Sequence, residues 1–247
     1  MSDEQDRLRA EWIEAHGAWN EDWSGLLEVD PGFFAGYLAL SAHPWREGAL
    51  EPKVKALVQI AVDAAATHLW GPGVRHHVRR ALALGASEAE IVETLELTAT
   101  MGIHACNVGV PLLLEELEAA GQPLERGPLS ERQEEIKADF TAKRGYWNDF
   151  WDGILHLDAE FFAAYTAFSA WSWEHGPLEP KVKELIYTAF DCSATHMFQP
   201  GLRQHIRNAI AYGASAAEIM EVFELASGIG AKAFALGAPA LLAERGA

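Results

Sequence analysis

The two halves of the chain repeat the same motifs at a constant offset, and about half of the aligned positions are identical. Trp19-Asn20-x-x-Trp23 returns as Trp147-Asn148-x-x-Trp151, and 147 − 19 = 128. The same offset relates Leu50-Glu-Pro-Lys-Val-Lys55 to Leu178-Glu-Pro-Lys-Val-Lys183, and no insertion interrupts the register. A regular internal repeat of this kind constrains the fold more than any single motif does, because both copies must form the same unit.

The repeats predict two domains of similar size. Repeat 1 covers residues 1–120 and repeat 2 covers residues 130–247, and the segment AAGQPLERGPL that joins them is rich in glycine and proline. A chain of 247 residues is long enough to give each repeat its own core. We therefore expect a tandem duplication of one domain.

Helix caps and apolar periodicity predict that both repeats are all-α. Ser2-x-x-Gln5 and Ser130-x-x-Gln133 are capping boxes, and Asp30-Pro31 has the N-cap and first-turn residues of a helix. Val54, Leu57, Val58, Ala61 and Val62 follow the spacing of one helical face. No alternating strand pattern occurs. We expect helices of repeat 1 to begin near Ser2, Asp30, Glu51, Pro72, Ser87 and Pro111, with a stop at Gly85.

Charge and composition exclude several classes of function. The net charge is −17 with only 19 Lys and Arg residues, which is a poor basis for binding nucleic acid or an anionic membrane. No apolar run approaches the roughly 20 residues that span a bilayer, and the polar start MSDEQDRLRAEW lacks the apolar region of a signal peptide. We therefore expect a cytoplasmic protein. Cys106 and Cys192 form no disulfide framework and are expected to be buried free thiols.

Comparison of the two repeats sorts the ten histidines. His76 became Gln204, and His104 became Lys232, so we interpret these positions as surface or incidental. The residues kept in both copies form the candidate set. They are His68/His196, His77/His205, Thr67/Thr195, Arg75/Arg203 and Asp63/Asp191.

The kept histidines allow three interpretations. In the first, they are general acids and bases, since imidazole titrates near neutral pH. In the second, they are hydrogen-bonded core residues of a helical corner. In the third, they are ligands of a transition metal ion. The metal alternative uses His68, His77, His196 and His205, but spacing nominates no further ligand. Asp63 lies five residues before His68, so we expect it on another helical face. The aromatic residues Trp19, Trp23, Phe33, Phe34, Tyr37 and Trp45 are expected in the core or in a pocket wall.

The run LEPKVKALVQIAVDAAATH, followed by HHVRRALALGASEAEIVETLEL, resembles the core of the carboxymuconolactone decarboxylase family. That family includes the alkyl hydroperoxidase D-like proteins. The resemblance covers about residues 50–118 and 178–246, and its most specific part, HVRRALALGAS-x-x-EI, returns as HIRNAIAYGAS-x-x-EI. It implies an all-helical, alkyl hydroperoxidase D-like domain in tandem. Family members form trimers or hexamers of single domains, so a homo-oligomer, and in particular a trimer of two-domain chains, is implied here.

The hydroperoxidase branch of the family carries a Glu, a CxxC pair and a His. The first Cys position falls at His68 and His196, and the relay His falls at His77 and His205. The relay Glu is Ala56 in repeat 1 and Glu184 in repeat 2. Without the thiol pair, thiol-dependent peroxidase chemistry is not expected.

The decarboxylase branch implies chemistry without a cofactor. By this resemblance, Arg75/Arg203 would anchor a substrate carboxylate beside Thr67/Thr195, and His77/His205 would deliver a proton. His68/His196 would be a second acid or base, and Glu184 gives repeat 2 the fuller set of ionisable groups.

We therefore expect a cofactor-free lyase or isomerase acting on a small carboxylated or aromatic-derived metabolite. The alternatives are a histidine-based metal-binding enzyme and a non-catalytic, ligand-binding helical oligomer.

Overall fold

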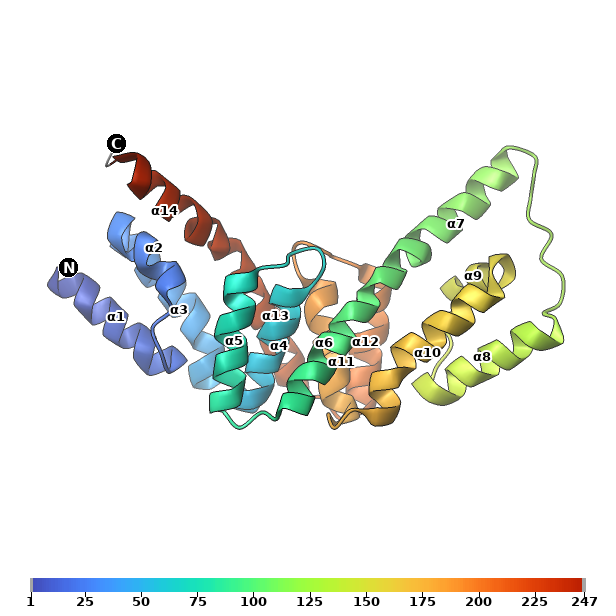
Figure 1. Cartoon of the computed structure of the whole chain (residues 1–247), viewed down its shortest axis with the longest axis horizontal. Coiled ribbons are helices and arrows are strands. Elements are labelled where there is room, and N and C mark those ends of the chain that lie inside the picture. Colours follow the sequence, from blue (N-terminus) through green and yellow to red (C-terminus); the bar gives the residue numbers. More distant parts are fainter. Residues whose placement is uncertain (1, 246–247) are drawn as a thin grey trace. The chain divides into compact units, whose positions relative to one another are not determined.

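The computed structural model describes residues 2–245, and within that range every regular element is helical (Figure 1). The all-α prediction is confirmed. Repeat 1 contains α1 (Asp3–His16), η1 (Glu21–Trp23), α2 (Ser24–Val29), α3 (Pro31–Glu47), α4 (Pro52–Ala64), α5 (Gly71–Ala83), α6 (Glu88–Ala99), η2 (Thr100–Ile103) and α7 (His104–Ala119). Repeat 2 contains α8 (Glu131–Arg144), η3 (Asp149–Trp151), α9 (Asp152–Leu157), α10 (Ala159–His175), α11 (Pro180–Cys192), α12 (Gln199–Ala211), α13 (Ala216–Ser227), η4 (Gly228–Ala231) and α14 (Lys232–Arg245).

The compact units of the structure do not follow the sequence repeats. Unit 1 comprises Met1–Thr98 and Leu178–Ala247, and unit 2 comprises Ala99–Pro177. In unit 1 the last helix of repeat 2, α14, packs on α2 of repeat 1. In unit 2 the last helix of repeat 1, α7, packs on α9 of repeat 2. Each repeat thus gives its final helix to the first helices of the other.

The helix caps agree with the sequence in most places. Ser2 and Ser130 form complete capping boxes, the Asp30 side chain accepts the N–H of Phe33, and Gly85 has a φ of +87° just after α5. The expectation at Pro111 was wrong. The helix begins at His104 and continues through Pro111, because the short η2 turn already connects α6 to α7.

The core of unit 1 is built on α4 and α11, which contact each other and pack on α5, α12 and α13. Two buried ion pairs hold this core together. Lys55 Nζ lies 2.8 Å from Glu221 Oε1, and Lys183 Nζ lies 2.7 Å from Glu93 Oε1. Each glutamate also accepts a backbone N–H at 2.7 Å, and these amides belong to Leu50 and Leu178. Every pair joins one repeat to the other within unit 1.

Aromatic residues form a second layer in each unit. In unit 1, Trp12, Trp23 and Phe34 are buried together with parts of α14, and in unit 2 the equivalent cluster includes Phe140 and Trp151. Phe33 is the exception to the sequence expectation. It is 51% exposed, because Phe34 instead occupies the inward face of α3.

Two helical stretches, Glu88–Ala119 and Ala216–Arg245, are long and apolar enough by length and composition to cross a membrane. The sequence expectation that no apolar run approaches this length was therefore wrong. The first part of each stretch carries a fully enclosed carboxylate, Glu93 or Glu221, in an ion pair of the unit 1 core. That part owes its apolar character to core packing. The expectation of no membrane partner stays a prediction.

Candidate functional site

The corner after α4 folds back on Asp63. The helix ends at Ala64, and Leu69 adopts a φ of +49°, which reverses the chain so that the N–H of Trp70 donates to the Asp63 carbonyl at 2.8 Å. His68 therefore lies beside Asp63. The expectation that these two residues face apart was wrong, since it assumed that the helix continues through residue 68. Repeat 2 forms the same corner, in which the Phe198 N–H donates to the Asp191 carbonyl at 3.0 Å.

Asp63 is the centre of a buried cluster that we name the Asp63 site, made of Asp63, His68, His77 and Lys232. Its Oδ1 lies 3.8 Å from His68 Nε2, and its Oδ2 lies 3.6 Å from His77 Nε2. The Asp63 carboxylate is enclosed against the first turn of α5, where a Cβ on Gly73 would collide with it. Glycine at this position is what allows the close approach.

Lys232 completes the Asp63 site from the first turn of α14. Its Nζ contacts Asp63 Oδ1 and lies 3.5 Å from His68 Nε2. Burial lowers the pKa of Lys232 to about 7, and the Asp22 carboxylate acts in the opposite direction. The contact with Asp63 also favours the ammonium form. Both protonation states of this amine are therefore accessible near neutral pH.

A cavity of about 50 Å³ opens beside this cluster in unit 1. By the same measure a single water needs roughly 10–15 Å³, so the cavity has space for a small ligand. Its walls are aromatic side chains with a ring of ionisable groups. They include Trp12, Trp23, Tyr37 and Trp70, together with His16, Asp22, Asp63, His76, His77, Arg80 and Lys232. Of the aromatic residues expected in a pocket wall, Trp23 and Tyr37 are present.

The histidines of the cavity are held neutral. Burial lowers the pKa of His77 well below its ordinary value, and the nearby His76 and Arg80 add to the effect. Burial followed by Arg80 lowers the pKa of His76 to about 4 and that of His16 to about 3. At neutral pH these imidazoles carry no charge and can take part in hydrogen bonds as donors or acceptors.

Arg80 supplies a half-buried cation, one of whose donors is buried and unused. Its guanidinium lies over the Trp45 ring, 3.2 Å from the centroid, and Nη2 donates to the Ala15 carbonyl at 3.5 Å. Nη1 is buried and has no hydrogen-bond partner. Burial lowers the pKa of Arg80 to about 9, so the group remains a cation at neutral pH. An unpaired buried donor of this kind favours an anionic ligand.

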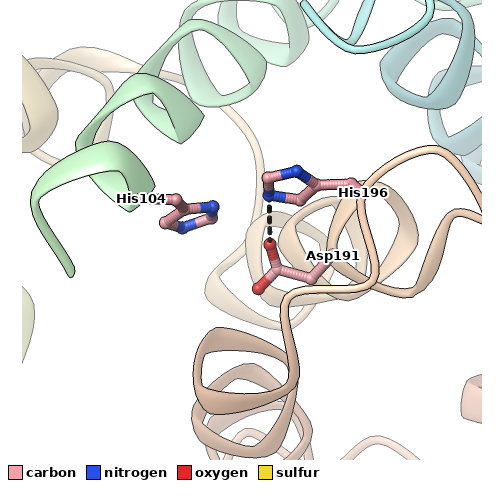
Figure 2. A group of neighbouring side chains, drawn as sticks. All are labelled: His104, Asp191 and His196. Carbon is pink, nitrogen blue, oxygen red and sulfur yellow. Dashed lines mark ion pairs between the residues drawn. The ribbon is translucent and has the colours of Figure 1, made fainter. Parts of the chain in front are cut away.

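Repeat 2 forms a related cluster in unit 1, which we name the Asp191 site, made of Glu184, Asp191, His196 and His205. His196 Nε2 lies 3.7 Å from Asp191 Oδ1 (Figure 2), and His205 Nε2 lies 4.0 Å from Asp191 Oδ2. His205 Nδ1 lies 2.6 Å from Glu184 Oε2. Burial, with the charge of Glu184, raises the pKa of Asp191 well above its ordinary value. His104, also drawn in Figure 2, belongs to unit 2.

The Asp191 site differs from the Asp63 site in its charges. Asn208 stands where repeat 1 has Arg80, and its Nδ2 donates to Glu184 Oε1 at 3.1 Å. Glu184 in turn stands where repeat 1 has Ala56. The cation of one site is thus replaced by an amide, and a fully buried carboxylate is added.

The predicted substrate-binding residues lie elsewhere. Arg75, Arg203, Thr67 and Thr195 are exposed, and none of them lines the cavity. The Oγ1 atoms of Thr67 and Thr195 lie 3.4 Å apart. The structure thus brings His68 and His77 together but leaves Arg75 outside. Cys106 and Cys192 are free thiols as expected, although both are half-buried rather than buried.

The sequence comparison missed Arg80, Lys232, His16 and His76. It kept only residues shared by both repeats, and each of these four differs between the copies. Two differences between the repeats could have indicated the site. Ala56 and Arg80 of repeat 1 correspond to Glu184 and Asn208 of repeat 2, so a positive pair of positions in one copy is negative in the other. Positions that differ between the repeats therefore indicate the cavity residues better than positions that are identical.

Comparison with known proteins shows which family has this architecture. The model of the carboxymuconolactone decarboxylase family matches residues 31–113 and again residues 159–243. The chain belongs to this family. A crystal structure of a candidate gamma-carboxymuconolactone decarboxylase subunit from Burkholderia xenovorans LB400 superposes with a TM-score of 0.95 at 46% identity. The match covers 98% of each chain, so the tandem arrangement is common to both proteins. A comparison with curated proteins found no match.

Proposed function

We propose that this protein is a lyase that removes carbon dioxide from a small carboxylated or aromatic-derived metabolite in the cavity of unit 1, by proton transfer and without an organic cofactor. The observation that carries the proposal is the buried, unpartnered Nη1 of Arg80 in a cavity that also presents Lys232 and neutral histidines. Gamma-carboxymuconolactone is the first substrate to test, since a 46% identical protein carries that name.

Arg80 is the proposed carboxylate anchor. A guanidinium that is already desolvated and held over Trp45 loses little freedom when an anion arrives. Charge-assisted hydrogen bonds to a buried carboxylate are stronger than those between neutral groups. The aromatic walls formed by Trp12, Trp23 and Trp70 suit a flat, conjugated ring. Arg80 therefore takes the role that the family resemblance implied for Arg75.

Lys232 is the proposed proton donor. When the bond to the carboxylate breaks, carbon dioxide leaves and the electron pair stays on the ring carbon, delocalised into the neighbouring carbonyl. The Lys232 ammonium then gives its proton to that carbon and is recharged from solvent. An acid with a pKa of about 7 is matched to this task at neutral pH. In this proposal His68 and His77, which lie close to Asp63, relay the proton from solvent to Lys232, each accepting it on one ring nitrogen and releasing one from the other.

The proposal is tested by measuring carbon dioxide release from gamma-carboxymuconolactone and, in parallel, quenching of tryptophan fluorescence as related lactone and phenolic acids are titrated. Three cavity tryptophans make fluorescence a direct report of occupancy. We expect saturable binding of the carboxylate forms and turnover of at least one of them. If no carboxylate quenches the wild-type protein differently from a protein carrying Arg80→Asn, the proposed site is wrong.

A homo-oligomer, as a trimer of two-domain chains, is part of the proposal. Phe161, Phe168 and Trp171 lie on one face of α10 and are about half exposed, and α3 presents Phe33 and Leu40 at the equivalent positions. Light scattering after size exclusion is expected to give three times the mass of one chain. Phe168→Asp is expected to lower that mass, and a wild-type monomer would contradict this part.

A further inference from the structure

Lys232 is a largely buried amine that lies where a ligand can reach it. Its side chain is only 14% exposed, and it lines the cavity of unit 1 from the first turn of α14. Lys55 and Lys183 are buried more deeply, at 4% and 3% exposed, but they form the core ion pairs and do not line this cavity. Of these three lysines, Lys232 alone is placed to meet a bound ligand.

A lysine amine is a nucleophile only in its neutral form, and the surroundings of Lys232 make that form available. Burial lowers the pKa of Lys232 to about 7, so a large share of the amine is unprotonated at neutral pH. An exposed lysine keeps almost none of its amine in this form, because its ordinary pKa is about 10.4. A desolvated amine in a cavity is suited to attack a carbonyl carbon and form an imine.

The neighbours of Lys232 can carry the protons of such a reaction. Its Nζ contacts Asp63 Oδ1 and lies 3.5 Å from His68 Nε2. The Asp63 carboxylate can take a proton from the nitrogen as it attacks and pass that proton to the carbonyl oxygen. The nucleophile and its proton carrier are therefore in contact in the folded chain.

Arg80 gives the same cavity a preference for an anionic carbonyl compound. Its Nη1 is buried without a hydrogen-bond partner, and the residue lines the cavity together with Lys232. The equivalent residues of the other repeat are Asn208 and His104, so neither group occurs twice. The cavity of about 50 Å³ suits a small ligand. An oxo acid, which has a carboxylate and a ketone or aldehyde group, offers a partner to each residue.

We propose that Lys232 forms an imine with the carbonyl carbon of a small oxo acid whose carboxylate binds Arg80. The neutral amine attacks the carbonyl carbon, a C–N bond forms, and the electron pair of the carbonyl π bond moves to oxygen. The two amine hydrogens then pass to that oxygen as protons, the C–O bond breaks, and water leaves. The proposal rests on the proposed function for the Arg80 anchor alone, since its substrate and its chemical step are different.

The test traps the imine in the full-length protein with glyoxylate, the smallest oxo acid, and sodium cyanoborohydride, which reduces the protonated imine to a stable secondary amine. Mass spectrometry of peptides locates the adduct and follows its rate of formation. Lys53 and Lys181 are internal controls, because they are partly exposed and hydrogen bonds to glutamates raise their pKa values. At neutral pH we expect Lys232 to be labelled about 10-fold to 100-fold faster than either. Unfolding in guanidinium chloride should abolish this preference.

Acetaldehyde is the matched control ligand, since it has the aldehyde group of glyoxylate without the carboxylate. Arg80→Asn installs the residue of repeat 2 and is expected to slow labelling by glyoxylate about 10-fold, while labelling by acetaldehyde changes by less than about 2-fold. Lys232→Arg keeps the cation and removes the nucleophile, so no adduct is expected at this position. Circular dichroism verifies that both variants are folded, and the comparison of lysines within the wild-type chain needs no variant.

Labelling of Lys232 that is no faster than labelling of Lys53, or a preference that persists after unfolding, would overturn the proposal. An equal effect of Arg80→Asn on the two aldehydes would overturn the choice of an oxo acid. Carbon dioxide release from gamma-carboxymuconolactone without trapping would overturn this proposal and leave the proposed function intact. Trapping without carbon dioxide release from any lactone or phenolic acid would support this proposal and contradict the proposed function.

Discussion

The Asp63 site and the Asp191 site occupy equivalent positions of the two repeats but differ in their charged groups. The first contains the Lys232 ammonium, and the second contains the Glu184 carboxylate. Both place a buried aspartate between two histidines at a helical corner, and both need a glycine where the next helix touches the aspartate. The Asp63 site contains Lys232 and shares its cavity with Arg80, whereas the Asp191 site contains Glu184, which is hydrogen-bonded to Asn208. The first site therefore has cations nearby that the second lacks, and the second has a buried glutamate that the first lacks.

This difference shows that duplication preserved the helical core, which we call the shared frame, and changed the side chains of the two sites. The Lys55–Glu221 and Lys183–Glu93 pairs are the same on both sides, within 0.1 Å in their shorter distances. The shared frame fixes the positions from which the site side chains extend. A few substitutions inside it then decide which ligand each site accepts.

The largest effect is expected from Lys232→Gln. Removal of a general acid costs about 10²–10⁴ in rate, so kcat for decarboxylation is expected to fall within that range. In the wild type, activity is expected to decline as pH rises through about 7, because the ammonium loses its proton there. The variant should lack this limb of the pH profile. An unchanged profile would show that another group delivers the proton.

The shared frame is tested by Lys55→Met and Lys183→Met. Each variant leaves a buried glutamate, Glu221 or Glu93, without its cation, and we expect a loss of about 3–5 kcal/mol in the free energy of unfolding. Urea denaturation followed by circular dichroism measures both. The two losses should agree within roughly 1 kcal/mol. A large difference between them would mean that the frame is not symmetric.

Ala56→Glu introduces at the Asp63 side of unit 1 the carboxylate that Glu184 provides at the Asp191 site. The new carboxylate would stand as Glu184 does and pair with Arg80, so it competes with the substrate, and KM is expected to rise about 10-fold to 100-fold. Ala56→Gln has the same shape without the charge and should raise KM much less. Equal effects of the two variants would indicate crowding instead of charge.

The smallest effect is expected from Arg75→Ala. Arg75 is exposed and lies outside the cavity lining, so kcat/KM should change by less than about 2-fold. The family resemblance implied that this residue is the carboxylate anchor. A loss of 10-fold or more in steady-state kinetics would restore that assignment and count against Arg80.

Most of the fold could be predicted from the sequence because its signals are local. Capping boxes at Ser2 and Ser130, and the proline starts at Pro31 and Pro52, act within one turn of chain and gave the helix starts correctly. The exchange of α7 and α14 could not be predicted. It depends on which apolar face each helix meets in space, and spacing along the chain does not encode that choice.

The candidate site was predicted only in part for the same reason. His68 and His77 were found because both repeats keep them, and their common carboxylate was missed because the turn at Leu69 reverses the chain. Lys232 reaches the Asp63 site from a helix 164 residues away in sequence from His68. Only the folded arrangement joins them.

The central claim is that the cavity of unit 1 beside the Asp63 site binds an anionic substrate through Arg80 and catalyses its decarboxylation. It is tested most directly by kcat/KM for carbon dioxide release from gamma-carboxymuconolactone in Arg80→Asn, which installs the residue of the other repeat, with Arg79→Asn, an exposed neighbour, as control. We predict a loss of about 100-fold for Arg80→Asn, the value of a buried charge-assisted hydrogen bond of nearly 3 kcal/mol, and less than about 2-fold for the control. A loss below 3-fold at Arg80, or an equal loss at Arg79, would contradict the account.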